Sequence, residues 1–244
     1  MLARSRQAVK QVLRRFNRQI VYWKEGTLSG IDLVHDLQIV VARDNPLCLD
    51  VGANEGQTID LLRRAWPAAR IHAFEPSPRA FEVLRQKHPG SDVVLHHYAL
   101  GQAPATQTLI CYDRSDLSSF LPIDTASRPF GSVGEVARET VQVRTIDEVL
   151  EAHGLDGVDL LKVDTQGTDL DVLKGADKAL RSGALRAILV ELNFARVYRR
   201  QADPLEVIAF LRDRRYDLVD LYEKVLEDGA LAWCTALFRF RGER

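Results

Sequence analysis

Cysteine is scarce in this sequence, and long apolar runs are absent. The three cysteines, Cys48, Cys111 and Cys234, lie far apart and form no C-x-x-C pair. This spacing excludes a disulfide framework and a cysteine-based zinc site, and it predicts three buried thiols in a reducing cytoplasm. No apolar run reaches the roughly 18 residues of a membrane-spanning helix, and the N-terminus lacks the apolar core and cleavage site of a secretory signal. We therefore expect a cytoplasmic protein.

Net charge is also nearly absent. The 244 residues contain 33 basic and 34 acidic side chains, which gives a net charge of -1, and 46% of the residues are hydrophobic. General nucleic-acid-binding proteins are usually far more basic, so we expect no nucleic-acid partner. The composition is typical of a globular protein, and the length fits one large domain or two small ones.

Basic and acidic side chains are unevenly distributed along the chain. Residues 1–24 carry seven basic side chains and no acid, which leaves 26 basic and 34 acidic side chains in the other 220 residues. Apolar residues recur there at helical spacing, at Val9, Val12, Leu13, Phe16 and Ile20. The pattern predicts a basic amphipathic helix that contacts a membrane surface, packs on the rest of the chain, or joins two copies in a homodimer. We interpret residues 1–45 as an N-terminal helical extension and residues 46–244 as the main domain.

Short apolar runs alternate with helical patterns through the main domain. The expected strands are residues 47–51, 70–74, 93–100, 160–163, 187–192, 216–222 and 233–240. The expected helices are residues 58–65, 78–88, 169–180 and 204–214. This alternation predicts a doubly wound, Rossmann-like α/β fold, in which helices cover both faces of a mostly parallel seven-stranded sheet.

One region interrupts the alternation. Residues 105–112 and 140–144 alternate between apolar and polar side chains like two antiparallel strands, and a polar stretch separates them. We expect an inserted hairpin and loop, which is often a lid or a substrate loop.

The turn after the first expected strand, D-V-G-A-N-E-G from Asp50 to Gly56, is unsuited to a dinucleotide. A G-x-G-x-x-G fingerprint that starts at Gly52 needs glycine where the chain has Asn54 and Gln57, and no P-loop follows. The turn instead suits S-adenosylmethionine, which has no pyrophosphate. Asp50 can sit near the ammonium group of that molecule, directly or through a water molecule, and Gly52 lets the backbone come close to the cofactor.

The end of the second expected strand carries Glu75, 23 residues after Gly52. A carboxylate at this place can accept hydrogen bonds from both hydroxyls of a ribose. Proteins that bind NAD also hold the ribose hydroxyls with an acidic residue at this place, so Glu75 alone does not distinguish the two cofactors.

Two later strands also end in polar side chains. Asp164 follows one, and Glu191 and Asn193 end the next, so we expect all three at one rim of the sheet. If the group that receives the methyl is a hydroxyl, as the resemblance given below implies, it is a poor nucleophile that needs a base or a metal ion. We therefore take Asp164 and Glu191 as catalytic candidates, and we raise the hypothesis that Asp164, Glu191 and Asn193 bind Mg²⁺ through oxygen atoms. His97, which follows His96 at the end of the third strand, is a further candidate base.

These motifs together resemble the FkbM-type S-adenosylmethionine-dependent methyltransferases. The resemblance covers about residues 46–240 and is carried by the turn from Asp50 to Gly56, F-E-P at 74–76, A-L-G at 99–101, L-K-V-D-T-Q-G at 161–167 and V-L-K-G-A at 172–176. It implies a class I methyltransferase sheet and transfer to oxygen. Carried over position by position, it assigns to the cofactor Ala53, Asn54, Thr58, Pro76, Ser77, Ala99 and Asp164, in addition to Asp50, Gly52, Gly56 and Glu75.

The resemblance also implies the kind of acceptor, which is a hydroxyl of a sugar, a glycan or another natural product. Many relatives have Glu where this chain has Gln166, so any base at that place must be another group here. Two alternatives stay open at this stage. One is an NAD-dependent reductase or epimerase, and the other is a non-catalytic methyltransferase-like module attached through the basic helix.

Overall fold

The computed structural model describes residue 24 and residues 26–90, 92–124 and 133–242. The predicted basic helix at residues 1–24 lies outside the described residues, except for Lys24. Within the described part of the chain, no helix combines the length and the apolar character needed to cross a bilayer.

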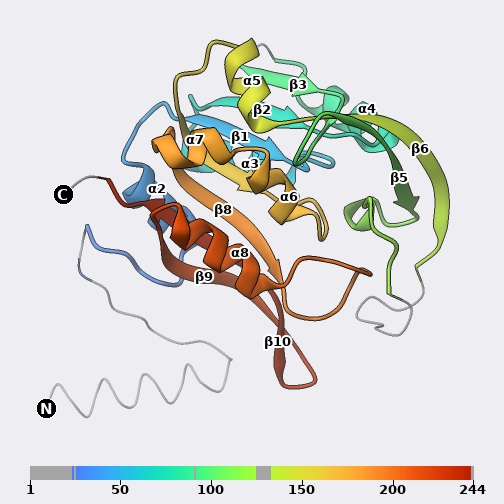
Figure 1. The fold of residues 1–244 in the computed structure, drawn as a ribbon. Helices are drawn as coiled ribbons and strands as arrows, with labels where there is room; N and C mark the ends of the chain where they lie inside the picture. Colours follow the sequence, from blue (N-terminus) through green and yellow to red (C-terminus); the bar gives the residue numbers. More distant parts are fainter. Residues whose placement is uncertain (1–23, 25, 91, 125–132, 243–244) are drawn as a thin grey trace, which may run out of the picture.

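A seven-stranded sheet forms the centre of the molecule, in the order β3-β2-β1-β7-β8-β10-β9 (Figure 1). Its strands are β1 (Leu47–Val51), β2 (Arg70–Phe74), β3 (Val93–His96), β7 (Val158–Val163), β8 (Leu185–Asn193), β9 (Tyr216–Glu227) and β10 (Ala230–Phe240). The first five are parallel, whereas β10 is antiparallel to both β8 and β9. The predicted mostly parallel, seven-stranded α/β fold is confirmed. The order of strands reverses between β1 and β7, which is where ligands bind in open sheets of this kind.

Helices cover both faces of this sheet, and alternate residues of the strands supply the apolar surface that they bury. Helices α5 (Ile146–Ala152), α6 (Asp169–Lys174), α7 (Asp177–Ser182) and α8 (Pro204–Asp213) pack on one face. Helices α2 (Leu33–Val41), α3 (Gln57–Ala65) and α4 (Pro78–Lys87) pack on the other. Along β1, for example, Leu49 belongs to the first core and Cys48 to the second, because successive side chains of a strand point to opposite faces.

The inserted region forms a small second sheet of β4 (Ala99–Leu100), β6 (Glu135–Arg144) and β5 (Ala105–Tyr112), in that order. The predicted single strand over residues 93–100 is therefore wrong in its second half. Since β3 is an edge strand of the large sheet, the chain can leave it after His96, and Ala99 then pairs with Val143 of β6. A short 3₁₀ helix, η1 (Ser115–Leu117), follows β5.

Two helices differ from the prediction. The expected helix over residues 169–180 is divided into α6 and α7 at Gly175, where a Cβ atom would lie 2.0 Å from the backbone oxygen of Gly101. Helix α5 was not predicted, although Thr145 and Glu148 form a capping box at its start. In the predicted extension, α2 buries Leu37 completely in the core beside α3, so at least this helix packs on the main domain.

Candidate active site

A cavity of about 370 Å³ opens at the carboxyl ends of β1, β2, β7 and β8. Its main lining comes from the turn after β1, residues 74–76 at the end of β2, the carboxyl ends of β7 and β8 with the loop after β7, and residues 114–120 of the inserted region, which include η1. The predicted rim is thus a real concave site, and part of its wall comes from the insertion. Of the residues assigned to the cofactor from the sequence, those on the wall are Gly52, Ala53, Asn54, Thr58, Glu75, Pro76, Ala99 and Asp164.

The turn after β1 brings its backbone against the end of β7. Gly52 has φ +80°, and a Cβ atom there would lie 1.9 Å from the backbone oxygen of Asp164. The amides of Gly52 and Ala53 both donate to the Phe74 carbonyl at 3.0 Å. No side chain fits at position 52, so the wall of the cavity at this point consists of backbone.

Glu75 is held by two backbone donors. The Asn54 amide donates to Oε2 at 2.8 Å and the Ser77 amide to Oε1 at 2.7 Å, which fixes the plane of the carboxylate. Burial raises the pKa of Glu75 to about 7 even though these two hydrogen bonds lower it. Each oxygen keeps a lone pair, so the carboxylate can still accept hydrogen bonds from a diol.

Two buried groups on this side lack hydrogen bonds among the described residues. One is the amide oxygen of Asn54, on the wall of the cavity, and the other is the carboxylate of Asp50. An unsatisfied buried acceptor is costly, and it is normally paired with water or a ligand. The open backbone at Gly52, the fixed carboxylate of Glu75 and the free acceptor of Asn54 all fit an adenosyl cofactor with hydroxyl and ammonium donors.

Asp50 itself does not reach the cavity. It has no exposed surface, it is absent from the lining, and the Lys162 ammonium on the wall lies 3.7 Å from its Oδ1. Burial raises its pKa. Asp50 therefore lies behind the wall next to Lys162, and a direct contact between Asp50 and an ammonium group of the cofactor has no opening here.

Lys162 links the two sides of the site. Its ammonium nitrogen lies 3.2 Å from Oδ2 of Asp164, in addition to its contact with Asp50. Burial by itself would lower the pKa of Lys162, but the carboxylates of Asp164 and Asp50 outweigh it and raise the pKa. Sequence reasoning gave this residue no role, although a charged side chain inside an apolar strand is a signal that it has a buried partner.

Asp164, directly after β7, and Glu191, near the end of β8, do lie close together as expected, but an amide stands between them. Nε2 of Gln166 donates to Oδ1 of Asp164 at 2.7 Å and to Oε2 of Glu191 at 3.3 Å, and Asn193 donates to the same Glu191 oxygen at 2.9 Å. Burial and the charges of Asp164 and Asp169 raise the pKa of Glu191 well above its ordinary range.

This arrangement does not fit the hypothetical Mg²⁺ site. A magnesium ion needs several oxygen ligands facing one point. Here the Gln166 NH₂ group and the Lys162 ammonium take up the carboxylate oxygens of Asp164, and the Asn193 side chain presents its NH₂ group to Glu191. We therefore derive no step through a metal ion at this place.

Two further residues hold Gln166 and its loop in place. The Tyr198 hydroxyl lies 2.8 Å from Oε1 of Gln166 and 2.9 Å from the Leu117 carbonyl, so its one proton can go to either. The Ser119 hydroxyl donates to the Gln166 backbone oxygen at 2.7 Å. Both join the insertion to the loop after β7. No local pattern in the sequence indicates these contacts, because the partners lie tens of residues apart.

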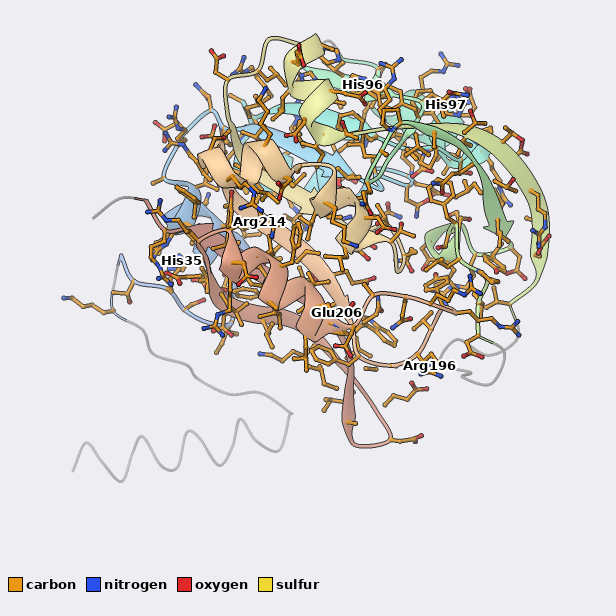
Figure 2. The ribbon with its side chains drawn as sticks, in the orientation of Figure 1. His35, His96, His97, Arg196, Glu206 and Arg214 are labelled. Carbon is orange, nitrogen blue, oxygen red and sulfur yellow. The ribbon has the colours of Figure 1, made fainter. Side chains whose placement is uncertain are left out.

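Three residues singled out from the sequence lie away from the cavity lining. His97 is exposed and stacks on Phe81, with ring centroids 4.4 Å apart (Figure 2). Gly56 is the N-cap of α3 with φ +95°, and Ser77 is the N-cap of α4. Gly56 and Ser77 thus shape the loops that carry the site. The position of His97 gives it no access to the cavity.

Comparison with known proteins agrees with this geometry. The sequence profile of the methyltransferase FkbM domain matches residues 50–218. The hexuronic acid methyltransferase AglP of Haloferax volcanii is 28% identical over 196 residues, covering 79% of this chain and 72% of that protein. The 2-O-methyltransferase NoeI of Sinorhizobium fredii is 24% identical over 228 residues, covering 86% and 88%.

A solved structure shows the same fold. The methyltransferase FkbM from Methylobacillus flagellatus KT superposes with a TM-score of 0.55 at 19% identity, over 90% of this chain. This chain spans 47% of the length of that structure. The match of the domain profile to more than half of the sequence and the cavity at the switch point of the sheet lead to one assignment: the chain belongs to the FkbM methyltransferase family and is an S-adenosylmethionine-dependent methyltransferase.

Proposed function

We propose that this methyltransferase acts on a hydroxyl oxygen of a sugar, a glycan or a sugar-like natural product. The observation that carries the proposal is the pair of carboxylates Asp164 and Glu191 on the cavity wall. A hydroxyl acceptor must lose a proton, and a carboxylate at this place can take it up. The printed names of AglP and NoeI, one of them for a hexuronic acid and the other for 2-O-methylation, support the same class.

The β1 and β2 side of the cavity would hold the cofactor. S-Adenosylmethionine, when bound, supplies an electrophilic methyl group on a sulfonium. Glu75 would accept hydrogen bonds from the two ribose hydroxyls, and the free oxygen of Asn54 would accept one from another donor. The glycine at position 52 would let the cofactor lie directly against the backbone.

The β7 and β8 side would position and activate the acceptor. Asp164 would accept the hydroxyl proton on its carboxylate, whose other neighbour is the Lys162 ammonium, 3.2 Å from Oδ2. Glu191, with its raised pKa, holds a proton more readily and can orient the acceptor by donating a hydrogen bond. The amide of Gln166 keeps the two carboxylates apart in these different roles.

Membership of the FkbM family displaces the NAD-dependent alternative. The non-catalytic alternative is not favoured by the cavity, because Glu75, Asn54 and Asp164 are all in place on its wall. Peripheral membrane contact and homodimer formation through residues 1–24 stay proposals, since the described residues exclude all but Lys24 of that segment.

A labelling experiment tests the proposed acceptor class. The protein is incubated with S-adenosylmethionine carrying a deuterated methyl group and with hexuronic acids, neutral glycosides and polyhydroxylated natural products. Mass spectrometry before and after mild alkaline treatment distinguishes a methyl ether, which survives, from a methyl ester, which is hydrolysed. We expect a labelled ether. Labelled esters or N-methyl products, or binding of S-adenosylhomocysteine without transfer to any hydroxyl compound, would contradict the proposal.

A further inference from the structure

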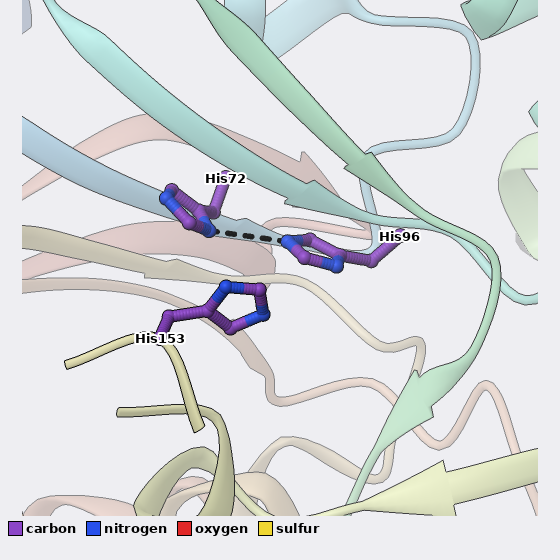
Figure 3. A group of neighbouring side chains, drawn as sticks. All are labelled: His72, His96 and His153. Carbon is purple, nitrogen blue, oxygen red and sulfur yellow. Dashed lines mark hydrogen bonds between the residues drawn. The ribbon is translucent and has the colours of Figure 1, made fainter. Parts of the chain in front are cut away.

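Three of the six histidines gather outside the cavity (Figure 3). His72 comes from β2, His96 from the end of β3 and His153 from the C-cap of α5. Each offers one ring nitrogen, and these nitrogen atoms all lie within 4.8 Å of one another. Three chain segments that are distant in sequence thus bring imidazole groups to one point.

The spacing of the rings matches a metal centre. The ring centroids of the three pairs lie 5.3, 5.2 and 5.1 Å apart. Three imidazoles bound to one tetrahedral Zn²⁺ at about 2.0–2.1 Å would place their ring centres about 5 Å apart, and their ligand nitrogens about 3.4 Å apart. The observed distance between Nδ1 of His72 and Nε2 of His96 is 3.1 Å. The rings therefore need small rotations, not new positions, to face one ion.

The surroundings of His96 also suit a ligand. The Tyr98 hydroxyl lies 3.3 Å from Nδ1 of His96. If Nδ1 carries the proton and donates it to Tyr98, Nε2 keeps its lone pair for a metal, which is the usual outer arrangement of a metal-binding histidine.

The surroundings limit which ion fits. The three ligands are neutral imidazoles without a carboxylate, which favours Zn²⁺ and similar transition metals over Mg²⁺ or Ca²⁺. Arg70 and Arg144 contribute positive charge nearby, and the Arg144 guanidinium lies 4.6 Å from the centre of the Tyr98 ring. These charges reduce the affinity for any cation. His153 is exposed, so an ion can enter from solvent on that side.

We propose that His72, His96 and His153 bind a divalent transition-metal ion, Zn²⁺ in particular, with a fourth position left to water. The ion would connect the C-terminal end of α5 to β2 and β3.

The position of this site gives it a structural role. The Glu75 amide donates to the His96 carbonyl at 3.0 Å, and Phe74, whose ring stacks on His96 at 4.5 Å, lines the cavity. The three histidines themselves do not line it. An ion would therefore stabilise the strand ends that carry Glu75 and would not take part in methyl transfer.

The test uses the full chain without a histidine tag, freed of metal by a chelator that is then removed. Zn²⁺ alone is titrated by calorimetry, and the bound metal is counted by elemental analysis after equilibrium dialysis. We expect one equivalent of Zn²⁺ and a melting temperature that rises with Zn²⁺ concentration. Co²⁺ in place of Zn²⁺ should give the visible absorption of a tetrahedral site.

Variants assign the ion to these residues. His153→Ala, at an exposed position, should fold normally and weaken Zn²⁺ binding by tenfold or more, and His72→Ala should do the same. His35→Ala is the matched control, because His35 lies on α2 away from the cluster (Figure 2). Binding of less than one equivalent by the wild-type chain, or equal affinity in wild type, His72→Ala and His153→Ala, would overturn the proposal. The measurement does not involve methyl transfer, so its failure would leave the proposed function intact.

Discussion

The wall of the cavity after β1 and β2 and the wall after β7 and β8 hold their functional groups in different ways. On the first side, backbone geometry does the positioning: Gly52 leaves the main chain bare, and two amides fix the carboxylate of Glu75. On the second side, side chains hold one another, since Lys162, Gln166 and Asn193 all donate to Asp164 or Glu191.

This difference in how the groups are held fits the two roles that we propose for the two walls, cofactor binding on one and proton uptake on the other. A cofactor is the same molecule in every turnover, so a rigid backbone shape suits it. A group that takes up a proton needs a tunable charge, which a network of side chains supplies through burial and neighbouring ions. If this distinction holds, substitutions on the first side should affect binding of the cofactor, and substitutions on the second side should affect turnover.

Gly52→Ala should give the largest effect. A Cβ atom 1.9 Å from the Asp164 backbone oxygen would force the two walls apart, in addition to the strain of φ +80°. We expect the free energy of unfolding to fall by more than about 4 kcal/mol, which a lowered melting temperature would show. Calorimetry should show no binding of S-adenosylhomocysteine. Gly229→Ala is the matched control, because its φ is +79° and no atom lies within 4 Å of the added Cβ. Similar losses in both variants would mean that backbone strain alone, not the contact between the walls, explains the effect.

Asp164→Asn should lower kcat by about 10²–10⁴, the usual contribution of a general base, which corresponds to about 3–5 kcal/mol. The affinity for S-adenosylhomocysteine should change by less than about tenfold, because the cofactor side keeps its own contacts. Single-turnover kinetics and calorimetry measure the two effects separately.

The control for that variant is Asp159→Asn, on β7, the strand that Asp164 directly follows. Asp159 accepts from the Leu47 amide at 3.0 Å and pairs with Arg43 at 2.9 Å at the opposite end of β7. It should lower stability without lowering kcat. A larger loss of cofactor affinity than of kcat in Asp164→Asn would place this residue on the cofactor side of the comparison.

The two sides also differ in how far the sequence predicts them. Gly52 and Glu75 could be located because each follows an apolar strand directly, and the local pattern defines both the strand and its end. Asp164, Glu191 and Asn193 could be located in the same way, but their partners could not. Tyr198 reaches Gln166 from the loop between β8 and α8, 32 residues along the chain. The chain route of residues 97–100 depends on pairing with β6, which is likewise a contact between distant segments. Such tertiary contacts leave no periodic signal in one sequence.

Glu75→Gln tests the charge on the cofactor side. The pKa of Glu75 is about 7 in the folded protein, against the ordinary value of 4.5. The folded state therefore binds more protons, and this contribution to the free energy of unfolding is greatest below about pH 4.5 and is lost as the pH rises to about 7. As the pH rises from about 4.5 to about 7, the free energy of unfolding of the variant should therefore rise by up to about 3 kcal/mol relative to that of wild type. Denaturant unfolding at several pH values measures this difference.

The same window should govern cofactor binding. In the proposed site the ribose hydroxyls would donate to the ionised carboxylate of Glu75, so the affinity of wild type for S-adenosylhomocysteine should rise up to about pH 7 and then level off. In Glu75→Gln the affinity should be lower and independent of pH. A parallel pH dependence in both proteins would show that another group, such as Asp169 with its pKa of about 6, is responsible.

Tyr198→Phe should give the smallest effect and the sharpest comparison. The Tyr198 side chain is fully buried, and loss of its hydroxyl removes one hydrogen bond to Gln166 or Leu117, which costs about 1 kcal/mol of stability. Tyr216→Phe loses one buried hydrogen bond, to the Leu185 carbonyl at 2.6 Å, and should cost about the same.

The two tyrosines differ in what they hold. Of the two, Tyr198 donates to the amide oxygen of Gln166 and so keeps the NH₂ group turned to Asp164 and Glu191. Turnover should therefore fall about fivefold in Tyr198→Phe and stay unchanged in Tyr216→Phe, while both keep the wild-type affinity for S-adenosylhomocysteine. Equal kcat in the two variants would mean that the carboxylates on the β7 and β8 side work without the amide between them.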